Sequence, residues 1–354
     1  MKPGHFCTYF DRGFLPQGLA LWRSMQAHDP EAVLWVLALD NITAEALRHL
    51  GGTNLRVVPL AELEAGDPAL AAVKPRRPGV DYIFTLSPCL PHWLMQSQPG
   101  IDRITYLDAD MLFFSNPQPI FDEMGAASVF LTAHRFPGFL RAHYERHGVY
   151  NVGVLSWRRD PQGLACLDWW RDSCLDWCHD RVEAGRYADQ KYLEEWPRRF
   201  TGVVEGRHPG VNLAPWNWMN HRYEFPDGLP RVDGQPLVLF HFARFRAAAV
   251  GNRWWQSGQL DYGVMPARLR NSIYGAYWRA LSAATGEIRS VGPDWRPQQR
   301  GLRLNRDFWR ELPLRLVFGS DWLRLGDRFV SGRLGAGRYS GRVLARLRTI
   351  FLRT

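Results

Sequence analysis

The chain has 354 residues, of which 46% are hydrophobic and 22% are charged, as in a globular protein with one large domain or two smaller ones. Its five cysteines are an odd number without regular spacing, which argues against a disulfide framework. The sequence has no run of about 18 apolar residues and no basic-then-apolar leader, so we expect a cytoplasmic protein.

The positive charge is concentrated near the end of the chain. Residues 300–354 hold 13 arginines and 4 acidic residues, which accounts for the whole net charge of +9. The preceding residues are formally neutral, so we expect no nucleic-acid partner. Arg342, Arg346 and Arg353 are interleaved with apolar residues and predict a basic amphipathic helix. Such a helix either lies on the anionic inner face of the membrane or is solvated or docked on the core.

Strand and helix patterns alternate through the first sixty residues. Strands are expected at 5–10, 32–39 and 55–59, with helices at 15–27 and 44–50. This alternation predicts an α/β fold, with a largely parallel sheet and helices on both faces.

The later elements follow from the same patterns. Helices are expected at 82–95, with interruptions at Pro88 and Pro91, at 164–183, from about 188, and at 268–284. Strands are expected at 104–107, 111–114, 128–132, 149–155, 203–204 and 237–241, with loops at 134–147 and 226–236. A boundary near 263–266 would divide an α/β domain at 1–265 from a helical, Arg-rich extension at 266–354.

Asp108 and Asp110 are the most informative residues, because they stand between two apolar runs where the strand at 104–107 ends. A buried charge is costly unless it is paired or binds a cation. In an extended Asp-x-Asp step both carboxylates point the same way, so Mg²⁺ or Mn²⁺ fits between them. Such ions keep positions open for substrate phosphates, and the motif therefore favours phosphate chemistry.

Two other chemistries compete with this interpretation. A phosphatase with a nucleophilic aspartate would normally have Thr or Val where Leu112 stands, and it needs a downstream lysine, of which the chain has few. Cys174 and Cys178, with His179 nearby, would allow a zinc site on the helix expected at 164–183. Small apolar packing is the commoner role for cysteines on a helix.

The Asp-Ala-Asp motif is one of several pieces that stand in a recognisable order. The others are a first strand with a polar end, Asn151-Val152-Gly153-Val154, Asp189-Gln190 and His241-Phe242. In order and spacing, residues 4–246 resemble the GT-A nucleotide-sugar glycosyltransferases of the glycogenin and galactosyltransferase type, family eight in the usual classification. The resemblance implies a GT-A fold and metal-dependent transfer from a UDP-sugar to a glycan or lipid-linked acceptor, with retention, in surface polysaccharide or glycoconjugate synthesis.

The resemblance also implies roles for individual residues. Asp108, Asp110 and His241 would bind Mn²⁺ or Mg²⁺. Asp189 and Gln190 would be the catalytic pair, and Asn151 and Gly153 would contact the donor sugar. The residues expected at the nucleotide are Thr8, Tyr9, Asp11, Arg77, Thr85, Ala109, Arg244 and Arg246; Arg244 or Arg246 would replace the lysine that the family has beyond its histidine.

Residues 208–218 are rich in aromatic faces and planar amides, groups that bind sugars, so His208, Asn212 and Trp216 are candidates for acceptor binding. Ordinary structural roles compete for the site residues, such as a hydrogen-bonded core histidine for His241 and a helix N-cap for Asp189.

Two other functions also remain open. A sugar nucleotidyltransferase would normally have a Gly-rich basic loop, which residues 4–18 lack, and a non-catalytic carbohydrate-binding or scaffold protein would keep the fold without the activity.

Overall fold

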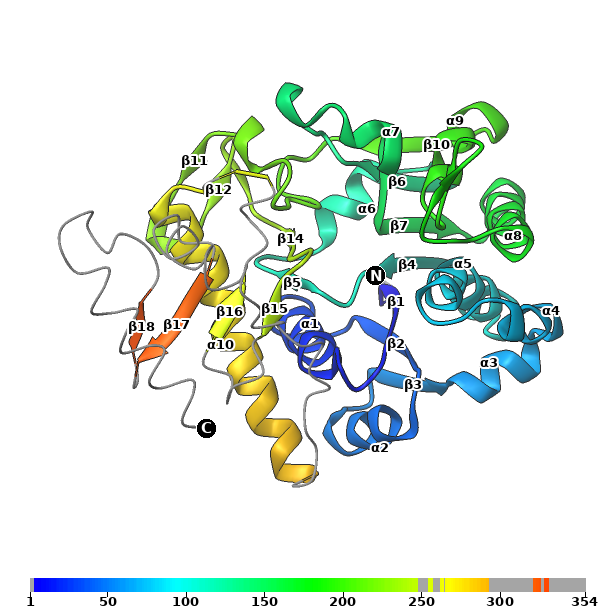
Figure 1. Cartoon of the computed structure of the whole chain (residues 1–354), viewed down its shortest axis with the longest axis horizontal. Helices are drawn as coiled ribbons and strands as arrows, with labels where there is room; N and C mark the ends of the chain where they lie inside the picture. Colours follow the sequence, from blue (N-terminus) through cyan, green and yellow to red (C-terminus); the bar gives the residue numbers. More distant parts are fainter. Residues whose placement is uncertain are drawn as a thin grey trace, which may run out of the picture.

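The structure is a computed structural model, and it describes residues 3–247, 254–256, 262–263, 265–292, 321–325 and 328–330. A seven-stranded sheet with helices on both faces forms its centre (Figure 1). From edge to edge the order is β10 (Val203–Gly206), β6 (Val129–Ala133), β7 (Tyr150–Arg158), β4 (Arg103–Leu107), β1 (His5–Phe10), β2 (Val33–Ala38) and β3 (Leu55–Pro59). Only β7 runs antiparallel to its neighbours in this sheet, so the expected α/β fold with a mixed, mainly parallel sheet is confirmed.

Helices bury the two faces of the sheet separately. On one face, α5 (Val80–Ser97) and α8 (Pro161–Asp176) share a core with the sheet, in which Leu90 and Trp170 join Ile104. On the other face lies α1 (Leu15–His28), and α10 (Ala267–Val291) packs against it. Because α10 contributes Ile273 and Tyr277 to the same core as α1, a helix beyond residue 265 helps to hold the sheet. The division of the chain near residue 265 stays a prediction.

The remaining described elements are short. The helices are α2 (Asn41–Leu50), α3 (Leu60–Gly66), α4 (Pro68–Val73), α6 (Gln118–Met124), α7 (His143–His147) and α9 (Trp196–Arg199), with 3-10 turns η1 (Lys74–Arg76), η2 (Gly138–Leu140), η3 (Lys191–Glu195), η4 (Trp218–Asn220) and η5 (Pro226–Gly228). The small sheets pair β5 (Met111–Phe113) with β14 (Leu239–His241), β8 (Val182–Glu183) with β9 (Arg186–Tyr187), β11 (Tyr223–Glu224) with β12 (Arg231–Val232) and β13 (Gln235–Pro236), and β15 (Arg246–Ala247) with β16 (Trp254–Gln256), β17 (Asp321–Leu325) and β18 (Arg328–Val330).

A helix was expected at 82–95 with interruptions at Pro88 and Pro91. The interruptions are wrong, because α5 runs through both prolines without a break. Each proline removes one backbone hydrogen bond and is costly inside a helix. Both side chains are buried, and the packing of α5 against the sheet and α8 outweighs the local preference. Two expected loops also contain regular structure: α7 lies within 134–147, and the β12–β13 hairpin lies within 226–236.

The helix expected at 164–183 ends at Asp176, several residues early. Trp177 has extended backbone angles, and the guanidinium of Arg77 donates to the carbonyl oxygens of Cys174 and Leu175 in the last turn. These carbonyls lack partners within the helix, so a distant arginine caps them. The β8–β9 hairpin follows α8, and the helix expected from about residue 188 is present from Lys191 as η3, which continues into α9.

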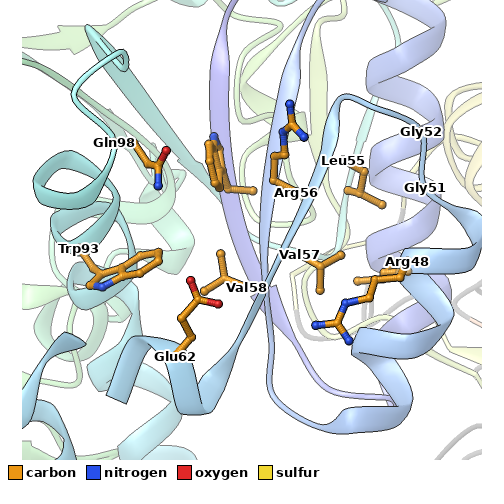
Figure 2. A pocket seen from close by; sticks show the side chains of 12 residues that line it. Arg48, Gly51, Gly52, Leu55, Arg56, Val57, Val58, Glu62, Trp93 and Gln98 are labelled. Atoms are coloured by element: carbon orange, nitrogen blue, oxygen red, sulfur yellow. The ribbon is translucent and has the colours of Figure 1, made fainter. Parts of the chain in front are cut away.

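The edge of the sheet at β3 borders a cavity of about 360 Å³ (Figure 2). Its lining includes Trp35, Trp93, Arg48, Arg56 and Glu62, and it shares no residue with the candidate site described below. None of the described helices is long and apolar enough to span a membrane. The basic helix expected around residues 342–353 lies outside the described residues.

Candidate metal centre

Asp108 and Asp110 lie in the turn between β4 and β5, at the carboxyl end of β4. Ligands of open α/β sheets bind at this end of the strands. Strand β14 pairs antiparallel with β5 and places His241 opposite Met111. A backbone hydrogen bond of 2.8 Å from Phe242 N to Asp110 O joins the two segments. Side chains that are far apart in the sequence therefore meet at one point.

The three side chains form a compact cluster. His241 Nε2 lies 3.2 Å from Asp110 Oδ1 and 3.5 Å from Asp108 Oδ2, and one ligand atom from each residue lies within 4.8 Å of the other two. Ala109 is buried between the aspartates. Two carboxylates and one imidazole are common ligands of divalent cations, so this set of side chains fits a divalent metal ion.

The electrostatics of the cluster show how strongly its members interact. Burial would lower the pKa of His241, but the carboxylates of Asp110 and Asp108 raise it above its usual value. Burial raises the pKa of Asp108, while His241 opposes that rise. Two half-buried carboxylates beside one buried imidazole are a costly arrangement unless a cation compensates their charge.

A network of buried amides lies beside the cluster. Asn151 Oδ1 accepts hydrogen bonds from Gly153 N and Asn212 Nδ2, both at 3.0 Å. Asn151 Nδ2 donates to Gln190 Oε1 at 3.2 Å, and Gln190 Nε2 donates to His147 O at 2.7 Å. The network joins four predicted site residues: Gln190 of the catalytic pair, Asn151 and Gly153 at the donor sugar, and Asn212 at the acceptor.

Asp189 is buried beneath α8, where Trp170 Nε1 donates to its backbone oxygen at 2.8 Å. Burial raises the pKa of the Asp189 carboxyl to about 7, although a hydrogen bond with Ser87 lowers it. The negative charge of Asp108 adds to the rise, so the two carboxylates are electrostatically coupled. Gln190, not Asp189, is the N-cap of η3, and that cap has no side-chain hydrogen bond, so the alternative role of Asp189 as a helix cap is wrong.

Three residues at the end of β1 were expected to bind the nucleotide, and their surroundings differ from one another. Thr8 is fully buried, and its hydroxyl finds no hydrogen-bond partner within the described part of the chain. The Tyr9 hydroxyl lies 2.9 Å from Ser87 Oγ. Asp11 Oδ1 accepts a hydrogen bond from Gly13 N at 2.9 Å and thereby closes its own turn.

Arg77 and Thr85 have a structural role in place of the nucleotide contact that we expected. Arg77 is buried, and besides capping α8 its guanidinium donates to Thr85 Oγ1 at 2.8 Å. The Thr85 hydroxyl in turn donates to Asp81 O at 2.9 Å. These polar groups are used inside the protein, so neither side chain is presented to a ligand.

Arg244 is exposed on the turn that follows His241, and its backbone is in the left-handed region with φ of 62°. Its guanidinium carbon lies 5.7 Å from the centre of the Tyr262 ring. Of the two arginines after His241 that were expected at the nucleotide, Arg244 is the one whose side chain is described. The side chain of Arg246 lies outside the described residues.

The residues expected at the acceptor separate into two places. Trp216 packs edge-on against His241, with ring centroids 5.2 Å apart, and Asn212 belongs to the amide network. His208 instead accepts a hydrogen bond from Gly210 N at 3.1 Å, and its backbone N donates to Glu123 Oε1 at 2.8 Å. His208 is thus tied to α6.

The segment 134–147 brings aromatic rings to the site that the sequence analysis left in a loop. His134 stacks on Phe136 with centroids 4.6 Å apart and meets Trp216 edge-on at 5.5 Å. His134 Nδ1 donates to Gly148 O at 3.0 Å, and burial lowers the pKa of His134 to about 3, so its ring is neutral. The density of histidines and aromatic residues in 134–147 was the signal available in the sequence.

The zinc alternative finds no support. Among the described residues, only one group of three or more His, Cys, Asp or Glu side chains is close enough to hold a metal. It consists of Asp108, Asp110 and His241. Cys174 and Cys178 are buried free thiols, and His179 Nδ1 lies 2.6 Å from Asp81 Oδ2.

Two proteins of Bacillus subtilis (strain 168) are similar to the chain over most of their length. YfnF is 32% identical over 252 residues, which cover 69% of this chain and 82% of YfnF. YfnD is 30% identical over 299 residues, which cover 83% of this chain and 94% of YfnD. The chain belongs to the YfnF and YfnD family. Both of these relatives are uncharacterized, and no known family profile matches the sequence.

Solved structures of glycosyltransferases are similar to this YfnF-family chain at low sequence identity. An active-site mutant of LgtC is 18% identical, with 83% of this chain and 100% of that chain covered and a TM-score of 0.46. Mouse xyloside xylosyltransferase 1 is 16% identical, with 68% and 98% covered and a TM-score of 0.43. The glycosyltransferase GlyE of Streptococcus pneumoniae TIGR4 is 14% identical, with 85% and 66% covered and a TM-score of 0.43.

Proposed function

We propose that the protein is a metal-dependent glycosyltransferase that moves a sugar from a UDP-sugar to a glycan or lipid-linked acceptor with retention. The observation that carries this proposal is the convergence of Asp108, Asp110 and His241 at the carboxyl end of β4. An isolated Asp-x-Asp would be an ordinary turn, but here a buried histidine from a distant strand completes a set of metal-binding groups. The order of the motifs along residues 4–246 supports the donor class.

Departure of the diphosphate is the electrostatic problem in sugar transfer, because negative charge builds on it as its bond to the sugar breaks. A divalent cation held by Asp108, Asp110 and His241 would offset that charge. Arg244, exposed on the turn directly after His241, supplies a second positive charge from this chain. Arg77 does not contribute, since its guanidinium caps α8.

The amide network determines what Gln190 can do. Its side-chain oxygen accepts hydrogen bonds from Asn151 Nδ2 at 3.2 Å and from Val152 N at 3.4 Å, which makes an already poor nucleophile poorer. Gln190 therefore orients the donor sugar and does not attack it. This favours attack by the acceptor on the face that the diphosphate leaves, without a covalent intermediate on Gln190.

We assign acceptor recognition to the aromatic residues beside His241 of the metal centre. Trp216 and His134 meet edge-on there, and Phe136 extends this buried aromatic cluster along 134–147. Aromatic rings present flat apolar faces that suit the C–H faces of sugars. A lipid-linked acceptor would suit peripheral contact with the membrane through residues 342–353.

The test is product formation with purified protein, a panel of UDP-sugars and either Mn²⁺ or EDTA. We expect Mn²⁺-dependent release of UDP from one donor, and we expect Asp110→Asn to abolish it. Asp122→Asn, which changes an exposed aspartate on α6, is the matched control and should be active. Pyrophosphate release from UTP and a sugar phosphate would instead indicate a nucleotidyltransferase, and the absence of both reactions would favour the scaffold function.

A further inference from the structure

The cavity at the open edge of the sheet is a second place where polar and aromatic side chains converge. Its volume of about 360 Å³ lies within the range of pockets that hold small ligands, and it borders β3, the last strand of the main sheet. Its polar and aromatic lining comes from β2, α2, β3, α3 and the end of α5, and consists of Trp35, Arg48, Arg56, Glu62, Trp93 and Gln98. Distant segments of the chain therefore build one site.

The polar side chains of this lining are not used inside the protein. Within the part of the chain that the structure describes, no side-chain hydrogen bond or ion pair is made by Arg48, Arg56, Glu62 or Gln98. Opposite charges elsewhere on the surface do pair, as Lys74 does with Glu64 at 2.6 Å. Four unpaired polar groups that share one cavity are available to a ligand.

The two tryptophans of the cavity are both half-buried, but they are held differently. Trp35 Nε1 donates to His5 Nδ1 at 3.3 Å, which fixes that ring on β2. Trp93 Nε1 is neither buried nor hydrogen-bonded within the described residues, so it is a free donor. Gly66 ends α3 beside it, and a Cβ atom there would overlap Trp93 Nε1. Only glycine at this position leaves the indole where it lines the cavity.

The edge of β3 offers a peptide strand little to pair with. In the parallel ladder with β2, Asn54 O accepts from Leu34 N at 2.9 Å, so by alternation Val57 turns its backbone N–H and C=O outward. Leu55 N already donates within the turn before β3 at 3.1 Å, and Pro59 has no N–H. The cavity therefore suits a ligand that is recognised by side chains.

A sugar chain fits the chemistry of these side chains. Aromatic faces flanked by planar polar groups suit sugar rings and their hydroxyls. Two guanidiniums, Arg48 and Arg56, are balanced by the single carboxylate of Glu62, which leaves one positive charge in excess. Because a guanidinium matches a carboxylate in shape and charge, an acidic sugar is favoured. Trp93 and Glu62 lie on one side of β3 and Arg48 lies on the other (Figure 2), so the sugar chain would cross the edge of the sheet.

We propose that this cavity is a second carbohydrate site, which binds an oligosaccharide that carries a carboxylate. Trp93 supplies the stacking surface, the two arginines bind the carboxylate, and Glu62 and Gln98 bind hydroxyls. The site goes beyond the proposed function, because it shares no residue with the metal centre and needs neither a cation nor a nucleotide. In a glycosyltransferase, such a site raises the effective concentration of a glycan that stays bound between transfers.

The experiment measures sugar binding to the full chain in EDTA by ligand-observed NMR titration. The probes are two trisaccharides that differ only in whether one residue is glucuronate or glucose. Trp93→Ala should weaken binding of the glucuronate probe about tenfold, because its stacking surface is lost. Trp169→Ala is the matched control and should bind like the wild type: Trp169 is also half-buried on a helix, but it packs against Tyr192 and Phe200 and does not line the cavity.

Exchange of both arginines for glutamine tests the charge assignment. The wild type should prefer the glucuronate probe about fivefold, and the double variant Arg48→Gln, Arg56→Gln should bind both probes alike. Arg76→Gln changes an exposed arginine outside the cavity and should keep the preference. Both exchanged arginines are exposed, so the double variant keeps the test valid if Trp93→Ala does not fold.

The outcomes separate this site from the transferase. A wild type that binds neither probe, or binds both equally, would overturn the proposal, as would equal binding by Trp93→Ala and Trp169→Ala. A dimer in sedimentation that Trp93→Ala dissociates would also overturn it, because a second copy would then cover the cavity. Asp110→Asn should bind the glucuronate probe like the wild type, and a loss there would place the sugar at the metal centre instead. Sugar binding without any transfer activity would overturn the proposed function alone.

Discussion

Gly153 lies directly against His241. A Cβ atom at position 153 would lie 2.9 Å from His241 Nδ1 and 2.5 Å from Asn151 Oδ1. Real Cβ atoms do not approach other atoms so closely, so only glycine lets β7 pass beneath the imidazole while Asn151 keeps its hydrogen bonds. The glycine of the Asn-x-Gly motif thus determines where the histidine of the metal centre can stand.

Gly153→Ala should therefore damage both stability and metal binding. The methyl group must displace His241 or Asn151, which costs about 1–3 kcal/mol of unfolding free energy. Urea unfolding and Mn²⁺ titration of the same preparation check both effects. Gly52→Ala, at a position with no atoms within 4 Å of the new Cβ, should change neither. Normal Mn²⁺ affinity in Gly153→Ala would contradict the expectation that this glycine sets the position of His241 as a metal ligand.

Arg77→Ala should reduce stability without a direct effect on donor binding. It leaves the last carbonyls of α8 without their charged donor, and we expect a loss of about 2–3 kcal/mol in unfolding free energy. The adjacent Arg76 is exposed, so Arg76→Ala is the matched control and should unfold like the wild type. Loss of UDP affinity in a folded, stable Arg77→Ala protein would contradict the structural role and restore the nucleotide contact that the sequence suggested.

Stability should decrease as the pH rises toward neutrality because of Asp189. Burial raises the pKa of Asp189 from 3.8 to about 7, so the folded protein holds a proton that the unfolded chain has already lost. The stabilisation is complete below the ordinary carboxyl pKa and is lost as the pH rises through about 7. Asp189→Asn cannot ionise, so urea unfolding between about pH 5 and about pH 8 should show a weaker pH dependence in this variant. Identical pH profiles for the two proteins would exclude a buried, protonated Asp189.

Gln190→Ala should release α7 from the amide network. The variant loses the hydrogen bond from Gln190 Nε2 to His147 O, so amide hydrogen exchange over 143–147 should become faster. Lys191→Ala removes a neighbouring bond to Glu145 O at an exposed position and should have a smaller effect. Unchanged exchange in Gln190→Ala would mean that α7 is held by its other contacts.

The sequence predicted those features that depend on local pattern. The bounds of β1 and β3 agree with the structure, because apolar residues in each strand are bounded by clear turn signals. The approach of His241 to Asp108 and Asp110 followed from a resemblance in the order of motifs, not from periodicity. Strand β14, which carries His241, shows no feature that would reveal its pairing with β5.

Contacts between distant segments account for what the sequence did not predict. The end of α8 depends on Arg77, which comes from the chain before α5, and the continuity of α5 depends on packing that outweighs two prolines. The same kind of contact gives Tyr9 its partner Ser87. A nucleotide contact and a structural hydrogen bond use the same residue types, and only the fold distinguishes them.

The most direct test of the account is calorimetric titration of UDP into the full chain, first with Mn²⁺ and then with EDTA, with GDP as the comparison nucleotide. We expect UDP to bind only with Mn²⁺, GDP to bind more weakly, and Asp110→Asn to lose the Mn²⁺ dependence while its melting temperature stays close to that of the wild type. UDP binding that is equal in Mn²⁺ and EDTA, or unchanged in Asp110→Asn, would contradict the metal centre, and no binding of either nucleotide would contradict the proposed donor.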